Sequence, residues 1–297
     1  MPNAKLKNYL HLHVLVFIAG FTGVLGELIS INAIPLVWYR MLIAAVLMLL
    51  YIKIRKIRLK ITSRSFVRFL LAGVIIALHW LTFFGSIKAA NISIALAMFS
   101  TGAFFGSIIE PLIYKRKIIW YEMIFGVLVV VGVILITQSE FKYIEGIVLG
   151  MLSALFGALF SVINGKLLEK HSASVISFYE FIGGVLFITL FIAFFDGGFT
   201  SDFFSLSQSD YIYLFILSSI CTAYAFIAAV SVMKYLSPYT LILTYNLEPV
   251  YGIILAILLF PEQEKMKPEF YLGAAIILVV VLLEGLLKNS KRIKKKV

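Results

Sequence analysis

The chain has 297 residues, of which 62% belong to the hydrophobic class and only 14% are charged. Soluble domains have about 45–50% apolar and about 25% charged residues, so this composition excludes a soluble enzyme, a nucleic-acid-binding domain and a disordered chain. It predicts a polytopic membrane protein. The net charge is +11. The chain has a single Cys, which excludes a disulfide framework and a Cys-rich metal site.

Apolar runs of about 18 or more residues are long enough to cross a hydrocarbon layer of about 30 Å as helices. The connectors between these runs are short, and the alternating pattern of transmembrane strands is not seen. The sequence therefore predicts an all-α membrane protein with ten spans. These spans are 11–30, 35–54, 66–87, 92–114, 118–137, 146–166, 174–195, 211–233, 238–260 and 270–287.

Charges at the ends of the spans predict the orientation. Most of the 26 basic residues fall on the side that holds both termini, and the other side has only Lys88, Lys142, Lys265 and Lys267. Basic residues mark the cytoplasmic side, so both termini are predicted to be cytoplasmic in a multi-pass protein.

The sequence divides into two similar halves of five predicted spans each. Trp38-Tyr39-Arg40 falls on Phe178-Tyr179-Glu180 at an offset of 140, and the segment from Lys88 falls on the segment from Lys234 at an offset of 146. Since five is odd, the second half must be inverted in the membrane. We expect two repeats, 1–140 and 141–297. Inverted repeats are typical of transporters, which bind substrate between the repeats near the bilayer midplane.

One further match is not equivalent. Glu110-Pro111 and Glu248-Pro249 are 138 residues apart, whereas the neighbouring spans require about 146. We expect these two Glu-Pro pairs to lie at different depths.

These features resemble the EamA family of the drug/metabolite transporter superfamily. The resemblance rests on Arg40 after Pro35, on Ser86-Ile-Lys-Ala-Ala-Asn-Ile-Ser-Ile-Ala, and on Leu247-Glu-Pro-Val-Tyr-Gly followed by Phe260-Pro-Glu and Gly273. It implies a central cavity enclosed by spans one to four and six to nine. It also implies export of amino acids or other small metabolites across the bacterial inner membrane. Ser100-Thr-Gly-Ala103 departs from the family pattern, which often has a Pro there.

Two ionisable residues are predicted near the midplane. Glu248 shares a helix face with Tyr245, and Pro249 predicts a kink beside them. His79 lies in span three next to Trp80. An acid buried here is a candidate proton carrier, and a His here is a candidate substrate ligand or proton relay. A structural role is the alternative for both residues.

Four charged residues lie nearer the span ends. Glu27 and Arg40 are at matched depth, which predicts an ion pair, and Lys166 and Glu180 are the corresponding positions in the second half. Arg40 and Glu180 are candidate anchors for a substrate carboxylate and amine. Structural pairs, or gates that break during transport, are the alternatives. Three further span tyrosines with polar neighbours are candidate cavity residues, namely Tyr39, Tyr179 and Tyr224.

The leading hypothesis is a secondary transporter that exports amino acids or related small metabolites, with proton coupling or facilitative uniport as options. Multidrug efflux by the same fold is the alternative, and a membrane-embedded enzyme is the alternative from a different class. No enzyme motif, nucleotide-binding motif or metal-ligand spacing is present in the sequence, so no catalytic residue, cofactor or metal is predicted. The sequence leaves the oligomeric state open.

Overall fold

The computed structural model describes residues 2–115, 117, 120–232, 235, 244–245 and 247–294. The first half contains α1 (Pro2–Leu28), α2 (Ala33–Ile54), α3 (Ser63–Ala89), α4 (Ile92–Phe99), α5 (Gly102–Tyr114) and α6 (Trp120–Ser139). The second half contains η1 (Phe141–Tyr143), α7 (Ile144–Leu168), α8 (Ala173–Phe195), η2 (Asp202–Phe204), α9 (Gln208–Ser218), η3 (Ser219–Tyr224), α10 (Ala225–Val232), α12 (Glu248–Leu259) and α13 (Pro268–Lys294).

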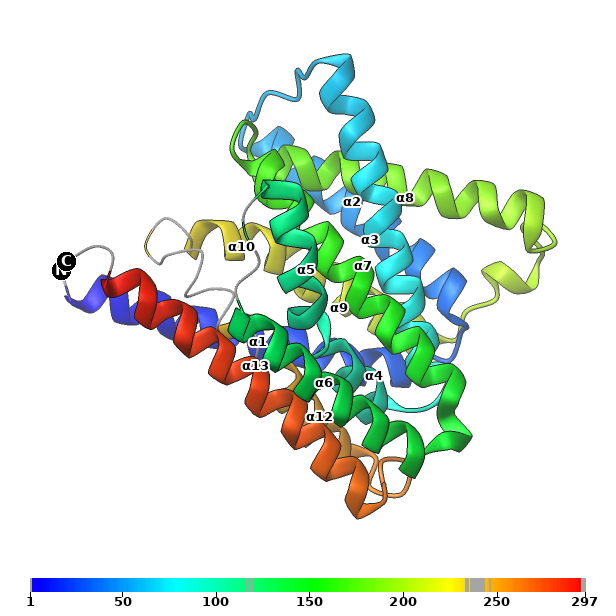
Figure 1. Ribbon diagram of the computed structural model, residues 1–297. Helices are drawn as coiled ribbons and strands as arrows, with labels where there is room; N and C mark the ends of the chain where they lie inside the picture. The colour runs from blue at the N-terminus through cyan, green and yellow to red at the C-terminus, as the bar shows by residue number, and fades with distance from the viewer. Residues whose placement is uncertain are drawn as a thin grey trace.

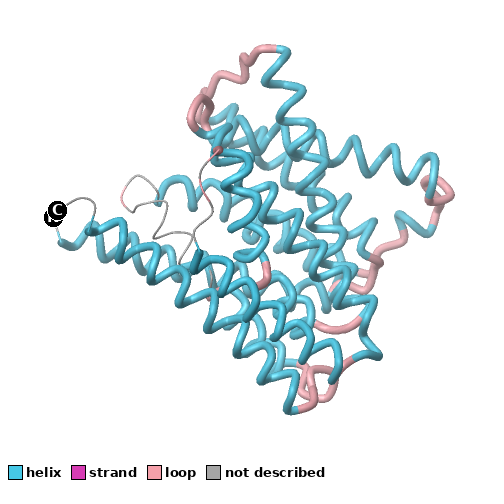
Figure 2. The backbone as a smooth tube through the Cα atoms, viewed as in Figure 1, coloured by secondary structure: helices cyan, strands magenta, loops and turns pink. Residues whose placement is uncertain are grey.

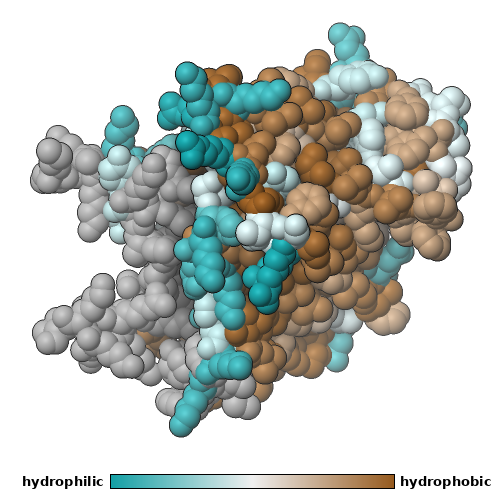
Figure 3. Space-filling model, turned by 90° about the horizontal axis from the view of Figure 1, so that it is seen from above, coloured by the Kyte–Doolittle hydropathy of each residue, from teal (hydrophilic) through white to brown (hydrophobic). Residues whose placement is uncertain are grey.

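The described helices correspond to the ten predicted spans, although residues 118–119, 233, 238–243 and 246 of those spans lie outside the described residues. Within the described residues, seven helical stretches are long and apolar enough to cross a membrane, and three shorter apolar helices accompany them. The shorter ones are Ile124–Ser139, Glu248–Leu259 and Pro268–Leu283, which correspond to predicted spans five, nine and ten. Large apolar side chains also point outward, among them Leu50, Leu112, Phe194 and Leu258. Figure 3 shows hydrophobic side chains gathered over the centre and right of one face of the molecule, as a lipid-facing surface requires.

The connections between spans fall at two ends of the molecule. In Figures 1 and 2, the connections 55–62 and 169–172 lie toward the top and upper left, and α1 begins and α13 ends on the left. The connections 196–207 and 260–267 lie toward the right and the bottom. We call the first the termini end and the second the opposite end. Because five spans separate equivalent points of the two halves, the second half runs inverted relative to the first.

Spans four and nine are both interrupted. The hydroxyls of Ser100 and Thr101 donate to the carbonyls of Leu96 (2.8 Å) and Met98 (2.7 Å) where α4 gives way to α5, a local bonding that competes with helix continuation. In the second half, α12 begins at Glu248. The starts of α5 and α12 are 146 residues apart, which is the offset predicted from the loops.

The position of Pro249 corrects one prediction. Instead of kinking a continuous helix, Pro249 lies in the first turn of α12. A proline costs little there, because the first backbone N–H groups of a helix have no partner within it. Pro111, by contrast, lies inside α5. The two Glu-Pro pairs are therefore not equivalent, as predicted.

Close helix crossings hold the two halves together. A Cβ atom on Gly20 of α1 would lie 2.9 Å from the backbone nitrogen of Gly252 on α12, and one on Gly73 of α3 would collide with the carbonyl of Glu180 on α8. At one side of the molecule, α6 packs chiefly against α13 (Figure 1). The remaining spans surround the buried core that contains the candidate site.

Candidate substrate site at the repeat interface

Arg40 is the buried cation of the core. It lies on α2 with a side chain that is only 4% exposed. Its Nε donates to the Thr222 hydroxyl at 2.9 Å, and its guanidinium carbon lies 3.9 Å from the centroid of the Trp80 ring. Stacking on an aromatic face and one hydrogen bond stabilise a buried guanidinium, while its remaining N–H donors stay available to a ligand.

Thr222 reaches Arg40 because span eight contains a π-helical turn. The segment η3 (Ser219–Tyr224) has π geometry, and within it the Thr222 hydroxyl donates to the carbonyl of Leu217, five residues back, at 2.8 Å. Such wide turns often occur at functional sites. Sequence reasoning missed Thr222, because no residue pattern in this span indicates where a π-turn forms.

Glu248 is the acid whose charge acts on Arg40. These two described side chains interact electrostatically without a direct ion pair. Glu248 is the first residue of α12, and the positive end of a helix dipole favours a carboxylate there. Tyr245 lies close to Glu248 and packs against the apolar cluster of α1 and α10.

The Trp80 ring that stacks on Arg40 also packs against two aromatic rings of the second half. The Trp80 ring centroid is 5.9 Å from that of Phe181 and 6.4 Å from that of Phe226, and Phe181 and Phe226 are 5.4 Å apart. Trp80 and Phe226 are 146 positions apart, which is the offset predicted from the sequence for this part of the two repeats. Their contact places Arg40 beside an interface between the two halves.

His79 lies one residue from Trp80 but faces another helix. Its Nδ1 lies 2.9 Å from the carbonyl oxygen of Ser153 and 3.0 Å from the Ser153 hydroxyl, both on α7. A Cβ on Gly157, one turn further along α7, would lie 3.2 Å from the same ring. Ser153 therefore fixes the orientation of the imidazole, and Nε2 is left as the nitrogen available to a ligand.

The predicted pair of Glu27 and Arg40 is wrong. Glu27 lies near Lys88, whose Nζ donates to the backbone carbonyls of Ile29 (2.5 Å) and Glu27 (3.5 Å). Matched depth does not fix the rotation of a helix. The rotation of α2 directs Arg40 toward η3 and α3 instead of toward α1.

Lys166 and Glu180 are also apart. Lys166 is exposed, and its Nζ donates to the Ile113 carbonyl at 2.6 Å. Glu180 is fully buried, and neither carboxylate oxygen has a hydrogen-bond partner among the described residues. The polar side chain that faces Glu180 is Asn164 on α7, which sequence reasoning missed.

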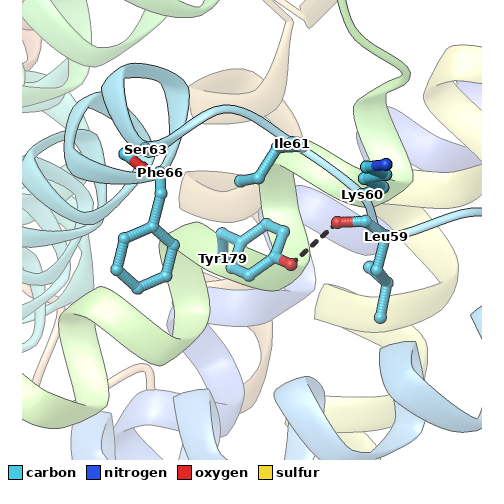
Figure 4. Close-up of a pocket in the computed structure, with 6 residues that line it drawn as sticks. All are labelled: Leu59, Lys60, Ile61, Ser63, Phe66 and Tyr179. Carbon is cyan, nitrogen blue, oxygen red and sulfur yellow. Dashed lines mark hydrogen bonds between the residues drawn. The ribbon is translucent and has the colours of Figure 1, made fainter.

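Three of the candidate tyrosines lie away from Arg40. The Tyr39 hydroxyl donates to the Phe203 carbonyl at 3.3 Å, and the Tyr224 hydroxyl lies 2.7 Å from His11 Nε2 on a side chain that is 43% exposed. Tyr179 lines a surface hollow of about 350 Å³ near the 55–62 connection, where its hydroxyl donates to the Leu59 carbonyl at 2.9 Å (Figure 4). The other residues that line this hollow are Lys60, Ile61, Ser63 and Phe66.

The sequence model of the EamA-like transporter family matches residues 7–138 and 144–284, one segment in each half. The chain belongs to the EamA-like transporter family. It is therefore a multi-pass membrane transporter, and members of this family are transporters rather than enzymes. The two matched segments fit the inverted architecture of ten helices in two repeats.

The chain was also compared with curated proteins and with solved structures. A comparison with curated proteins finds no match. One solved crystal structure of a protein aligns over 95% of this chain and 98% of its own, with a TM-score of 0.65 and 12% sequence identity. At that identity the likeness concerns the fold alone.

In this EamA-like transporter, hydrogen bonds join the two halves at the opposite end. The Glu264 carboxylate, in the connection before α13, accepts from the backbone nitrogens of Ile92 and Ser93, each at 2.9 Å, at the start of α4. The Asp210 carboxylate of α9 accepts from the backbone and hydroxyl of Ser30, each at 2.7 Å. Burial raises the pKa of Glu264, and its hydrogen bonds from Ser93 and Ile92 oppose that rise.

Proposed function

We propose that this transporter exports amino acids or closely related small metabolites across the bacterial inner membrane, with both termini in the cytoplasm, and that it is driven by protons. The observation that supports this most is the fixed cation, Arg40, facing the acid Glu248 beside Trp80 at the repeat interface. A zwitterion carries one charge for each of them.

In this proposal, Arg40 binds the substrate carboxylate. Its planar guanidinium suits a carboxylate, and the Trp80 ring already holds it in place. Glu248 binds the substrate ammonium and, in the other half of the cycle, a proton. The one carboxylate binds either the proton or the substrate ammonium, but not both at once. Proton movement in one direction therefore drives substrate movement in the other. His79 borders this site and supplies Nε2 as a further polar contact.

Reconstituted transport tests the proposal. Purified protein in liposomes should exchange labelled amino acids, and Arg40→Gln should abolish that exchange. Glu248→Gln should abolish accumulation driven by an imposed pH gradient, because Gln takes up no proton. Lys53→Gln is the matched control: it removes an exposed positive charge from the same helix and should leave exchange unchanged. Exchange of organic cations but of no amino acid would contradict the assignment.

Orientation is tested separately. A cysteine at Ser207 should react with an impermeant maleimide added to intact spheroplasts, whereas a cysteine at Ser290 should not. The native Cys221 is buried and provides the unlabelled background. The reverse labelling pattern would overturn the predicted orientation.

A further inference from the structure

Glu180 stands out among the buried acids of the protein. Its side chain is 0% exposed, and both carboxylate oxygens are buried without a hydrogen-bond partner among the described residues. Glu264 is almost as buried, at 2% exposed, yet accepts two backbone hydrogen bonds. Glu248 faces Arg40. Of these three, only Glu180 lacks both a backbone donor and a cation among the described residues, and the side chain that acts on it is the Asn164 amide.

The packing around Glu180 explains why no partner reaches it. On α3, Gly73 brings its backbone against the carbonyl of Glu180, and a Cβ on Gly183 would lie 2.7 Å from the backbone of Leu70. This crossing of α3 and α8 is backbone against backbone, with no side chain between.

No charged side chain of the neighbouring helices faces Glu180. The helices that pack against α8 are α2, α3, α7 and α10. The described segment α10 has no titratable residue. The ionisable groups of the other three point elsewhere, and the only side chain that acts on Glu180 is the Asn164 amide. Those groups are Tyr39, Arg40, Tyr51 and Lys53 on α2, Arg64, Arg68, His79 and Lys88 on α3, and Glu145 and Lys166 on α7.

The chemistry of the Glu180 and Asn164 side chains indicates what is bound between them. An unpaired carboxylate in an apolar interior costs several kcal/mol, a cost that a bound proton removes. Asn164 Oδ1 is itself a buried acceptor without a partner. A carboxylic acid has one O–H donor, so a proton on Glu180 supplies the donor that the Asn164 oxygen lacks. A metal cation would need more oxygen ligands than these three atoms provide.

We propose that Glu180 is a second proton-binding site, in which the carboxylic acid donates a hydrogen bond to Asn164 Oδ1 and so keeps α3, α7 and α8 packed together. Loss of the proton leaves an unpaired charge at the crossing, which favours separation of α3 from α8 and access from the termini end. The role of this step in transport rests on the proposed function, but the bound proton does not.

Infrared spectroscopy of the purified protein in lipid at neutral pH tests the site directly. A protonated carboxylic acid has a C=O band above the amide region. A protonated Glu248 would add a band of its own, so the comparison is made in Glu248→Gln. Glu248→Gln should keep a band, and the double variant Glu248→Gln with Glu180→Gln should lose it. Glu264→Gln in the same background is the matched control, because it removes a carboxylate that is almost as buried but hydrogen-bonded, and it should retain the band. A band that survives in the double variant, or that is already absent in Glu248→Gln, would overturn the proposal.

A second variant keeps the test open should Glu180→Gln fail to fold. Asn164→Leu removes the acceptor, so the band should shift to higher frequency while keeping its intensity. An unshifted band would show that Asn164 is not the acceptor. Replacing potassium by sodium in the buffer should change nothing, whereas loss of the band in sodium would point to a metal cation. No substrate is present, so these results stand even if amino acid transport fails its own test.

Discussion

Arg40 and Glu180 are equivalent positions in the repeat register predicted from the sequence, yet their surroundings in the structure are opposite. Arg40 is buried, donates a hydrogen bond to the Thr222 hydroxyl and stacks on the Trp80 ring. The charge of Glu248 also acts on it. Glu180 is buried with no cation and no backbone donor among the described residues, and the Asn164 amide is the side chain that acts on it. One repeat therefore holds a permanent charge ready for a ligand, and the other holds a group that is stable in the core only when it is neutral. Inverted repeats thus share a backbone plan without sharing chemistry.

The difference has a local cause in span eight. Thr222 reaches Arg40 from the π-turn η3, and the position 146 residues earlier is Ile76, which has no hydroxyl. Span three is a continuous helix from Ser63 to Ala89 at that point.

The largest expected effect comes from breaking the crossing at Glu180. Gly73→Ala places a Cβ against the backbone of Glu180, which has no flexible end that could move aside. We expect a loss of about 3 kcal/mol or more in the free energy of unfolding, measured by equilibrium unfolding in mixed micelles. Gly106→Ala is the control, because nothing lies within 4 Å of its Cβ and alanine favours the helix. Equal stability of the two variants would argue against the close crossing.

A smaller loss is expected on the Arg40 side. Arg40→Gln removes the guanidinium from the Trp80 face and leaves Glu248 without its cation, for a cost of about 2 kcal/mol. Adding Glu248→Gln should restore part of that stability, because the remaining charge is removed. Glu27→Gln should restore none of it. Thermal unfolding of the single and double variants measures the coupling of Arg40 to Glu248 and to Glu27. Recovery of stability by Glu27→Gln would support the ion pair of Glu27 and Arg40 that the sequence predicts.

The smallest effect should come from the hydroxyl alone. Thr222→Val keeps the volume of the side chain but removes the hydrogen bond to Arg40 Nε, for about 1.5 kcal/mol. Substrate affinity should fall as well, since Arg40 loses one of the contacts that orient it. Ser219→Ala removes an exposed hydroxyl from the same π-turn and is the control. If both variants bind substrate like wild type, Thr222 does not position Arg40.

The sequence by itself determined the class of protein and the ten spans, and it predicts the register of the repeats. The length of each apolar run and the charges at its ends are local properties, and the 146-residue offset read from the Lys88 and Lys234 segments also relates the starts of α5 and α12. The sequence also singled out Arg40, Trp80, Glu248 and His79, because charged and polar residues inside a span are rare.

Only the tertiary structure decided which of these residues meet. Arg40 contacts Thr222 across 182 positions of sequence, and Glu27, at the same depth as Arg40, turns to Lys88 instead. The rotation of each helix, the π-turn in span eight and the break before Glu248 depend on how the spans pack against one another. An apolar span has no strong face preference of its own, so its sequence fixes how deep a side chain lies but not the direction in which it points.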